Sequence, residues 1–224
     1  MEKRYVLFDL DGTLTNSYRG IINALKYSLS KFTVEPKEET FNKIIGPPVV
    51  WSLQNYYGFD EENAVKGLRY FREYYDRTGY LENELYPGTE EMLKTLRGHD
   101  KKLLLATSKP QKMAEKVLEH FGLDDYFCFV AGANSDDESS SKELGLRATK
   151  EDVIGYVLKT NGILDPENAV MVGDRHWDIR AGKVFGLQTI GVSYGFADPG
   201  ELEKAGADYI ASNPLMVSEI VVQQ

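Results

Sequence analysis

Residues 5–15 read YVLFDLDGTLT, a short apolar run that passes into an Asp-x-Asp-Gly-Thr sequence. The run 5–8 is apolar at nearly every position, which is typical of a strand buried on both faces of a sheet. In open α/β sheets, ligands bind beyond the carboxyl ends of the strands, where Asp9 and Asp11 stand. Gly12 permits the sharp turn that follows. An ordinary Asp-Gly turn, with Asp9 accepting from loop amides, is the alternative interpretation.

Outward from this stretch, short apolar runs alternate with amphipathic segments. Further strands are expected at 102–106, 127–130, 169–172, 189–192 and 209–211. Helices are expected at 88–96, 111–121, 150–160, 177–185 and 199–205. Strands that alternate with helices in this way predict an α/β fold with a doubly wound, parallel, Rossmann-like sheet.

Residues 16–85 interrupt this alternation. They contain no convincing strand, and helices are expected at 18–31, 37–44, 49–57 and 61–77. We therefore predict an α/β core of residues 1–15 and 86–224, with an all-helical subdomain, 16–85, inserted into it. The helical segment is rich in aromatic residues, and most of them, such as Phe71 and Tyr75, are expected to form its core. Whether Trp51 or Tyr56 faces a ligand stays open.

The composition limits the function classes. The chain has 224 residues, with 42% hydrophobic and 27% charged residues and a formal net charge of −9, which excludes a disordered or coiled-coil protein. The excess of acidic over basic residues disfavours binding to anionic partners such as nucleic acid or an anionic membrane surface. Cys128 is the only cysteine; it lies in an apolar run and is expected to be buried. The single cysteine and the absence of a signal peptide or long apolar stretch favour a cytoplasmic location.

A second apolar run ends in the same kind of residue. Residues 170–178 read VMVGDRHWD, so that Asp174 follows a predicted strand and Asp178 stands one turn into the next helix. Both aspartates have purely structural interpretations. Asp174 is a possible helix N-cap, and Asp178 a first-turn residue that favours the helix dipole.

Two weaker signals complete the set. Residues 103–110, LLLATSKP, predict a strand that ends in hydroxyl residues before a helix. Thr107 and the amides after it are candidates for anion binding, whereas Ser108 acting only as an N-cap is the alternative. Lys150 begins a helix, where the dipole disfavours a cation, so a specific anionic partner would explain it. A solvated surface lysine is the alternative.

Together these four segments resemble, in order and spacing, the motifs of the haloacid dehalogenase-like hydrolase superfamily, and the resemblance covers nearly the whole chain. Residues 16–85 resemble the helical cap of that superfamily. The stretches GPP at 46–48, FREYY at 71–75, ENELYPG at 82–88 and GDR at 173–175 are most similar to its phosphoglycolate phosphatase and 5′-nucleotidase-like branch.

The resemblance implies a role for each catalytic residue. Asp9 matches the nucleophile that forms an aspartyl phosphate, and Asp11 matches the general acid and base. Dehalogenase members lack this second aspartate, so Asp11 argues for phosphoryl transfer. Thr107 matches the phosphate-binding hydroxyl, and Lys150 matches the lysine that offsets the negative charge. The stretch before Lys150 is longer and more acidic than the family pattern, which makes Lys142 a competing candidate.

The resemblance also implies a Mg²⁺ site and a phosphate site. Asp174 matches the metal ligand, together with the Asp9 carboxylate and the Asp11 carbonyl, and Asp178 is expected in the outer shell of the metal. The substrate phosphate is expected to bind at a set of loop and strand-end residues: Gly12, Thr13, Thr107, Ser108 and Lys150.

These implications predict a Mg²⁺-dependent phosphomonoesterase that hydrolyses a small, phosphoglycolate-like metabolite and is a monomer or homodimer. A 5′-nucleotidase is the alternative, because an aromatic cap could stack a base. A sugar-phosphate mutase and a non-catalytic phospho-ligand module are weaker alternatives. A dinucleotide-dependent oxidoreductase is weaker still, because the first strand leads into no glycine-rich turn.

Overall fold

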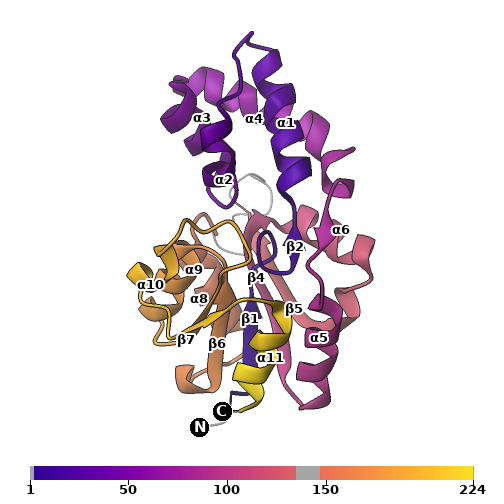
Figure 1. Ribbon diagram of the computed structural model, residues 1–224, viewed down its shortest axis with the longest axis vertical. Coiled ribbons are helices and arrows are strands. Elements are labelled where there is room, and N and C mark those ends of the chain that lie inside the picture. Colours follow the sequence, from indigo (N-terminus) through magenta and orange to yellow (C-terminus); the bar gives the residue numbers. More distant parts are fainter. Residues whose placement is uncertain (1–2, 135–146, 224) are drawn as a thin grey trace. The chain divides into compact units, whose positions relative to one another are not determined.

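The computed structural model describes residues 3–134 and 147–223. The chain forms two compact units, one of Met1–Thr15 with Leu85–Gln224 and one of Asn16–Glu84. The first unit is an α/β sandwich and the second is built from helices (Figure 1). The predicted fold class, a doubly wound parallel sheet with an inserted helical unit, is confirmed.

Six parallel strands form the sheet of the first unit, in the order β5-β4-β1-β6-β7-β8. They are β1 (Tyr5–Phe8), β4 (Lys102–Pro110), β5 (Phe127–Ala133), β6 (Ala169–Gly173), β7 (Gln188–Val192) and β8 (Tyr209–Ala211). In the register, Phe8 pairs with Leu105 on one side and Val172 on the other. This register brings Asp9 after β1, the residues after β6, and the Ala106–Pro110 part of β4 to one edge of the sheet.

The helices of this unit cover both faces of the sheet (Figure 1). They are α5 (Thr89–Gly98), α6 (Gln111–Phe121), α8 (Lys150–Thr160), α9 (His176–Val184), α10 (Glu201–Ala205) and α11 (Pro214–Val222). No helix was predicted at α11, because its run PLMVSEIVV is apolar on nearly all sides and lacks a helical period. Its start is fixed by Asn213, whose side chain accepts a hydrogen bond from the Met216 amide.

The core of the first unit forms where β1, β4 and β6 meet α8. Leu7, Leu104 and Met171 are buried there against Val153 and Val157 of the helix. The helix begins at a capping box, in which the Thr149 side chain accepts from the Asp152 amide and the Asp152 carboxylate accepts from the Thr149 amide. This start directs Lys150, the first helical residue, to the carboxyl edge of the sheet.

The expected burial of Cys128 is wrong, because its side chain is exposed. β5 is an edge strand, and an apolar run on an edge strand does not imply burial on both faces.

The second unit contains α1 (Tyr18–Ser30), α2 (Phe41–Ile44), α3 (Val49–Tyr57) and α4 (Glu61–Tyr75), with single 3₁₀ turns at Glu38–Thr40 and Gly79–Leu81. The Ser28 hydroxyl of α1 donates to the Gly67 carbonyl of α4 at 2.8 Å and ties the two longest helices together. Phe71 and Tyr75 are buried and stacked, as expected of core residues. Trp51 is 41% exposed and lies edge-on to Tyr56.

The chain passes between the units through two short strands, β2 (Thr15–Asn16) and β3 (Glu84–Leu85), which pair with each other. The expectation that 16–85 contains no strand is therefore wrong at its two ends, since strands of two residues carry no alternation to detect. Within residues 3–134 and 147–223, no helix has both the length and the apolar composition of a membrane span.

The packing of β1 makes a testable prediction. Leu7 is fully buried in the central strand, and we expect Leu7→Ala to lower the free energy of unfolding by about 2–5 kcal/mol, because it leaves a cavity that the sheet cannot close. Leu164→Ala is the matched control, because Leu164 is 94% exposed and its loss should cost less than about 0.5 kcal/mol. Urea unfolding followed by circular dichroism measures both. Equal losses in the two variants would contradict this core.

Candidate active site

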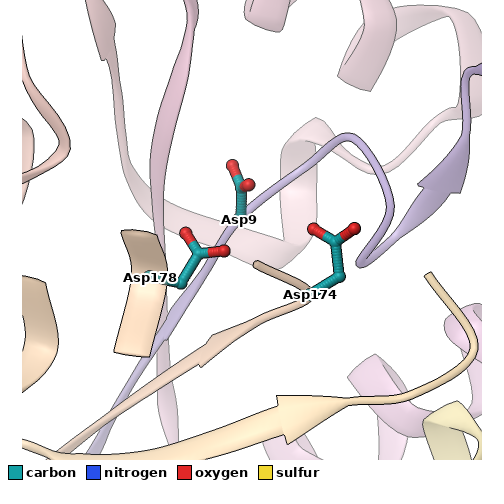
Figure 2. A group of neighbouring side chains, drawn as sticks. All are labelled: Asp9, Asp174 and Asp178. Carbon is teal, nitrogen blue, oxygen red and sulfur yellow. The ribbon is translucent and has the colours of Figure 1, made fainter. Parts of the chain in front are cut away.

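Three aspartates meet at the carboxyl edge of the sheet (Figure 2). Asp9 follows β1, Asp174 follows β6, and Asp178 lies in the first turn of α9. Each is buried, and one carboxylate oxygen of each lies within 4.8 Å of the others. We call these three residues the acidic triad.

Two glycines make this close approach possible. Gly12 has a φ of 82°, and a Cβ there would lie 2.1 Å from Asp174 Oδ2. A Cβ on Gly173 would lie 2.2 Å from Asp178 Cγ. A side chain at either position would displace a carboxylate of the triad, and at Gly12 it would also strain the backbone. The two glycines therefore hold space for the acidic side chains.

Asp174 carries the least compensated charge of the triad. Its Oδ2 accepts a hydrogen bond from the Phe196 amide at 2.8 Å. Its Oδ1 is buried and has no hydrogen-bond partner in the described part of the chain. Burial, together with the charges of Asp178 and Asp9, raises the pKa of Asp174 well above its usual value. A buried carboxylate in this position favours the arrival of a cation.

Lys150 supplies part of that positive charge. Its Nζ lies 2.9 Å from Asp9 Oδ1 and 2.7 Å from Asp178 Oδ1, and it donates to the Ala106 carbonyl at 2.9 Å. Burial lowers the pKa of Lys150, but the charges of Asp178 and Asp9 outweigh it and raise the pKa overall. Lys150 is therefore a charged partner of the triad and not a solvated surface lysine. The competing candidate, Lys142, lies outside the described residues.

Asp11 lies beside the triad but faces a different cation. Lys109 Nζ lies 3.0 Å from Asp11 Oδ1 and 2.8 Å from Asp11 Oδ2, and both side chains are nearly buried. The carboxylate of Asp11 is thus held apart from the triad. No role was predicted for Lys109, although it stands in the TSKP segment near the end of β4, where its place beside Thr107 and Ser108 is the available signal.

The other predicted phosphate-binding residues lie on the same edge. Thr107 is buried in β4, and its Oγ1 accepts from the Lys109 amide at 3.2 Å. Ser108 is half-buried and still within β4, so it is not the N-cap of α6, which is Pro110. Thr13 is buried beside Gly12, and its Oγ1 has no partner in the described part of the chain.

The purely structural roles considered for Asp174 and Asp178, a helix N-cap and a first-turn residue, do not account for their positions. The N-cap position of α9 is taken by Arg175 and not by Asp174. Asp178 does stand in the first turn, where its Oδ2 accepts from the Arg175 amide at 3.0 Å, but its Oδ1 faces Lys150. The connection after β7, which contains Phe196, also contacts the triad and was missed, since no sequence pattern marks it.

The chemistry of the donor set suits a hard divalent cation. Carboxylate oxygens are the ligands that such ions prefer, the triad presents three of them, and Asp174 Oδ1 is free of other partners in the described residues. Lys150 offsets only part of the negative charge, so the fit of a divalent metal at the triad is good.

Comparison with known proteins agrees with this geometry. The family model of haloacid dehalogenase-like hydrolases matches residues 6–192. A 5′-nucleotidase of Pseudomonas aeruginosa is 36% identical over 88% of this chain and 86% of its own length. The tyrosine-protein kinase PtkA of Mycobacterium tuberculosis is 33% identical over 92% of this chain and 67% of its own. The structure of a predicted phosphatase from Clostridium acetobutylicum has a TM-score of 0.90 at 39% identity and covers all of both chains.

The chain belongs to the haloacid dehalogenase-like hydrolase family. The resemblance seen in the sequence is thereby confirmed, and so is the predicted class of enzyme, a phosphatase of this family.

The raised pKa of Asp174 predicts how the metal-free protein responds to pH. A carboxyl group whose pKa is raised on folding stabilises the folded state while it is protonated, and this contribution is lost as the pH rises through the folded-state pKa. We therefore expect Asp174→Asn to melt at a higher temperature than the unsubstituted protein at pH 7 in EDTA, with a difference that shrinks toward pH 4. A gain of about 1 kcal/mol would shift the midpoint by ~2–4 °C.

Differential scanning calorimetry from pH 4 to pH 8 measures this effect. Asp100→Asn is the control, because Asp100 is exposed and asparagine tolerates its positive φ. An Asp174→Asn variant that is less stable than the unsubstituted protein throughout this range would contradict the repulsion inferred for the triad.

Proposed function

We propose that this enzyme is a Mg²⁺-dependent phosphomonoesterase that acts on a small phosphorylated metabolite in the cytoplasm. The observation that carries the proposal is the buried acidic triad, with Lys150 between Asp9 and Asp178. Carboxylates and one ammonium, gathered at the carboxyl edge of a parallel sheet, suit the charge of a phosphoryl group held together with a divalent metal.

In the first step, an Asp9 oxygen attacks phosphorus and the bond from phosphorus to the leaving oxygen breaks. The leaving alkoxide takes a proton from Asp11 in its acid form. The product of this step is an alcohol and an aspartyl phosphate on Asp9. Lys150, which contacts Asp9 Oδ1, offsets negative charge as the phosphoryl group approaches.

In the second step, water attacks the same phosphorus atom and the bond to Asp9 breaks. Asp11 now takes a proton from the water, which restores its acid form and releases inorganic phosphate. The Lys109 ammonium, at hydrogen-bond distance from both Asp11 oxygens, orients the carboxylate for this proton transfer.

Mg²⁺ is the metal that we propose for the triad. Asp9 and Asp174 would hold it together with the Asp11 carbonyl, while Asp178 fixes Lys150 and the start of α9. The ion would supply the positive charge that allows an anionic substrate to approach three carboxylates. Thr107, Ser108 and the amides after Gly12 are the proposed ligands of the phosphoryl oxygens.

The proposal extends to the substrate. We propose that the helical unit, Asn16–Glu84, is a cap that selects the leaving group, and that a phosphoglycolate-like acid is its substrate, as the sequence resemblance implies. Nucleoside monophosphates are the second candidate, favoured by the relative from Pseudomonas aeruginosa that is named a 5′-nucleotidase. The exposed Trp51, in edge-on contact with Tyr56, is the surface that would stack on a base.

Substitution of the nucleophile gives the sharpest test of the mechanism. We expect Asp9→Asn to lower kcat by three or more orders of magnitude, on the order of the cost of removing the nucleophile in other hydrolases. Lys150 keeps its contact with Asp178, so the variant should still fold. Asp125→Asn, at an exposed position, is the control and should retain full activity. Turnover of Asp9→Asn near the original rate would rule out Asp9 as the nucleophile.

A substrate panel tests the reaction and the substrate together. Phosphate release is measured from phosphoglycolate, nucleoside monophosphates, sugar phosphates and an aryl phosphate, with Mg²⁺ and with EDTA. We expect hydrolysis that EDTA abolishes and Mg²⁺ restores, since the triad repels an anionic substrate without the ion. Isomerisation of a sugar phosphate without phosphate release would instead indicate a mutase. No release from any member of the panel, by protein shown to be folded, would overturn the proposal.

A further inference from the structure

The connection between β7 and α10 carries contacts that the proposed mechanism does not use. It spans residues 193–200 and leads into Glu201, the first residue of α10; all of it lies in the α/β unit. It reaches the triad through residues 194–196 at its start, and Glu201, directly after its end, contacts the turn that follows β6. Side chains and amides at both places contact the loops that carry Asp9 and Asp174, the proposed metal ligands.

Glu201 is the centre of the second contact. Its Oε1 accepts from Arg175 Nε at 2.9 Å and from the His176 amide at 2.9 Å, and it lies 2.6 Å from His176 Nδ1. Its Oε2 accepts from the Asp198 amide at 3.0 Å. The carboxylate therefore joins the start of α10 and the connection before it to Arg175 and His176, the two residues that follow Asp174.

The charge of Glu201 is strongly stabilised in this position. Burial alone would raise the pKa of Glu201, but the hydrogen bonds from His176 and Arg175 outweigh it and lower that pKa to about 2. The residue is thus ionised at all physiological pH values. A carboxylate that accepts several charge-assisted hydrogen bonds is a rigid anchor and not a surface charge.

Arg175 and His176 stand between two members of the triad in the sequence. Asp174 precedes them and Asp178 follows them, and the Arg175 amide donates to Asp178 Oδ2 at 3.0 Å. Whatever fixes Arg175 and His176 therefore fixes both carboxylates. Glu201 contacts neither carboxylate, so it acts on them only through this turn.

Tyr194 and Phe196, at the start of the connection, contact the loops that carry Asp9 and Asp174. The Phe196 amide donates to Asp174 Oδ2 at 2.8 Å, and the Tyr194 hydroxyl donates to the Thr13 carbonyl at 2.9 Å. A Cβ on Gly195 would lie 2.4 Å from both Asp174 Cβ and the Gly12 carbonyl oxygen. The connection is packed directly on the turn after β1 and on the residue after β6.

From these contacts we infer that Glu201 is a positioning residue for metal binding, which presets Asp174 and Asp178 through Arg175 and His176. The inference rests on the proposed function, since it assumes that the triad holds Mg²⁺. Outer residues that orient metal ligands typically change metal affinity or activity 10–100-fold when they are replaced. The effect should therefore appear in the binding of Mg²⁺ itself, before any substrate is added.

The test compares Glu201→Gln with Glu203→Gln in the full chain. Both substitutions remove one negative charge from α10, but Glu203 is exposed and lies on the same helix two residues on. The dissociation constant of Mg²⁺ is measured by calorimetry on metal-free protein, and the rise in melting temperature on adding Mg²⁺ is measured beside it. Steady-state kinetics at increasing Mg²⁺ then give kcat and KM for whichever phosphate ester is hydrolysed, with the aryl phosphate as the default.

We expect Glu201→Gln to raise the dissociation constant of Mg²⁺ about 10–100-fold and to shrink the Mg²⁺-dependent rise in melting temperature. The kcat should recover when Mg²⁺ is raised, with KM for the ester unchanged, because the side chain does not touch the substrate. Glu203→Gln should match the unsubstituted protein. If Glu201→Gln does not fold, Arg175→Lys, which keeps the charge but loses the Nε donor, should weaken Mg²⁺ binding in the same direction.

Two results would overturn the inference, and they are distinguishable. If the unsubstituted protein binds Mg²⁺ and a folded Glu201→Gln or Arg175→Lys variant binds it equally well, Glu201 does not position the triad. If the unsubstituted protein binds no Mg²⁺ at all, the metal site of the proposed function fails, and this inference falls with it.

Discussion

The repulsion among three buried carboxylates is the constraint on which the rest of the site depends. Asp9, Asp174 and Asp178 lie within reach of a single ion, and burial makes their mutual repulsion far stronger than it would be in water. Lys150 relieves the part of it that involves Asp9 and Asp178. The negative charge of Asp174 is not offset by a paired cation among the described residues, and burial with the neighbouring charges therefore raises its pKa. An arrangement of this kind costs stability without a cation, which is why it points to function and not to folding.

The fold can maintain that repulsion because each carboxylate is attached to a rigid element. The register of β1 with β4 and β6 brings Asp9, Thr107 and Asp174 to one edge of the sheet, and the packed core beneath them, around Leu7 and Val157, holds these strands together. The volume that the three carboxylates occupy is left free by two glycines. Gly12 and Gly173 stand where a Cβ would collide with the triad, so the acidic groups fill the volume that the glycines leave.

Much of this architecture could be predicted from the sequence, because it rests on local patterns. The run before Asp9 is apolar at successive positions and is a buried strand, and the helical period at 111–121 and 150–160 matches α6 and α8. Predictions were wrong where the local signal was absent or misleading. The helix α11 lacks a polar face, and β2 and β3 are too short to alternate. Cys128 stands on an edge strand, so the apolar run around it did not imply burial. For the site, the aspartates were identifiable since each follows a strand. Lys109 was missed because its partner, Asp11, is distant in the chain.

Glu201 could not be predicted for the same reason, because its partners Arg175 and His176 lie about 25 residues away in the chain. Its contacts also show how an acidic protein can compensate the charges around its site. The formal net charge is −9, yet two carboxylates close to the triad are tied to cations: Asp11 to Lys109, and Glu201 to Arg175. These pairs are neutral locally, so they do not add to the repulsion. The proposed divalent ion would be attracted to the triad because these two neighbouring charges are compensated, and the positioning inferred for Glu201 would hold its ligands in place before it binds.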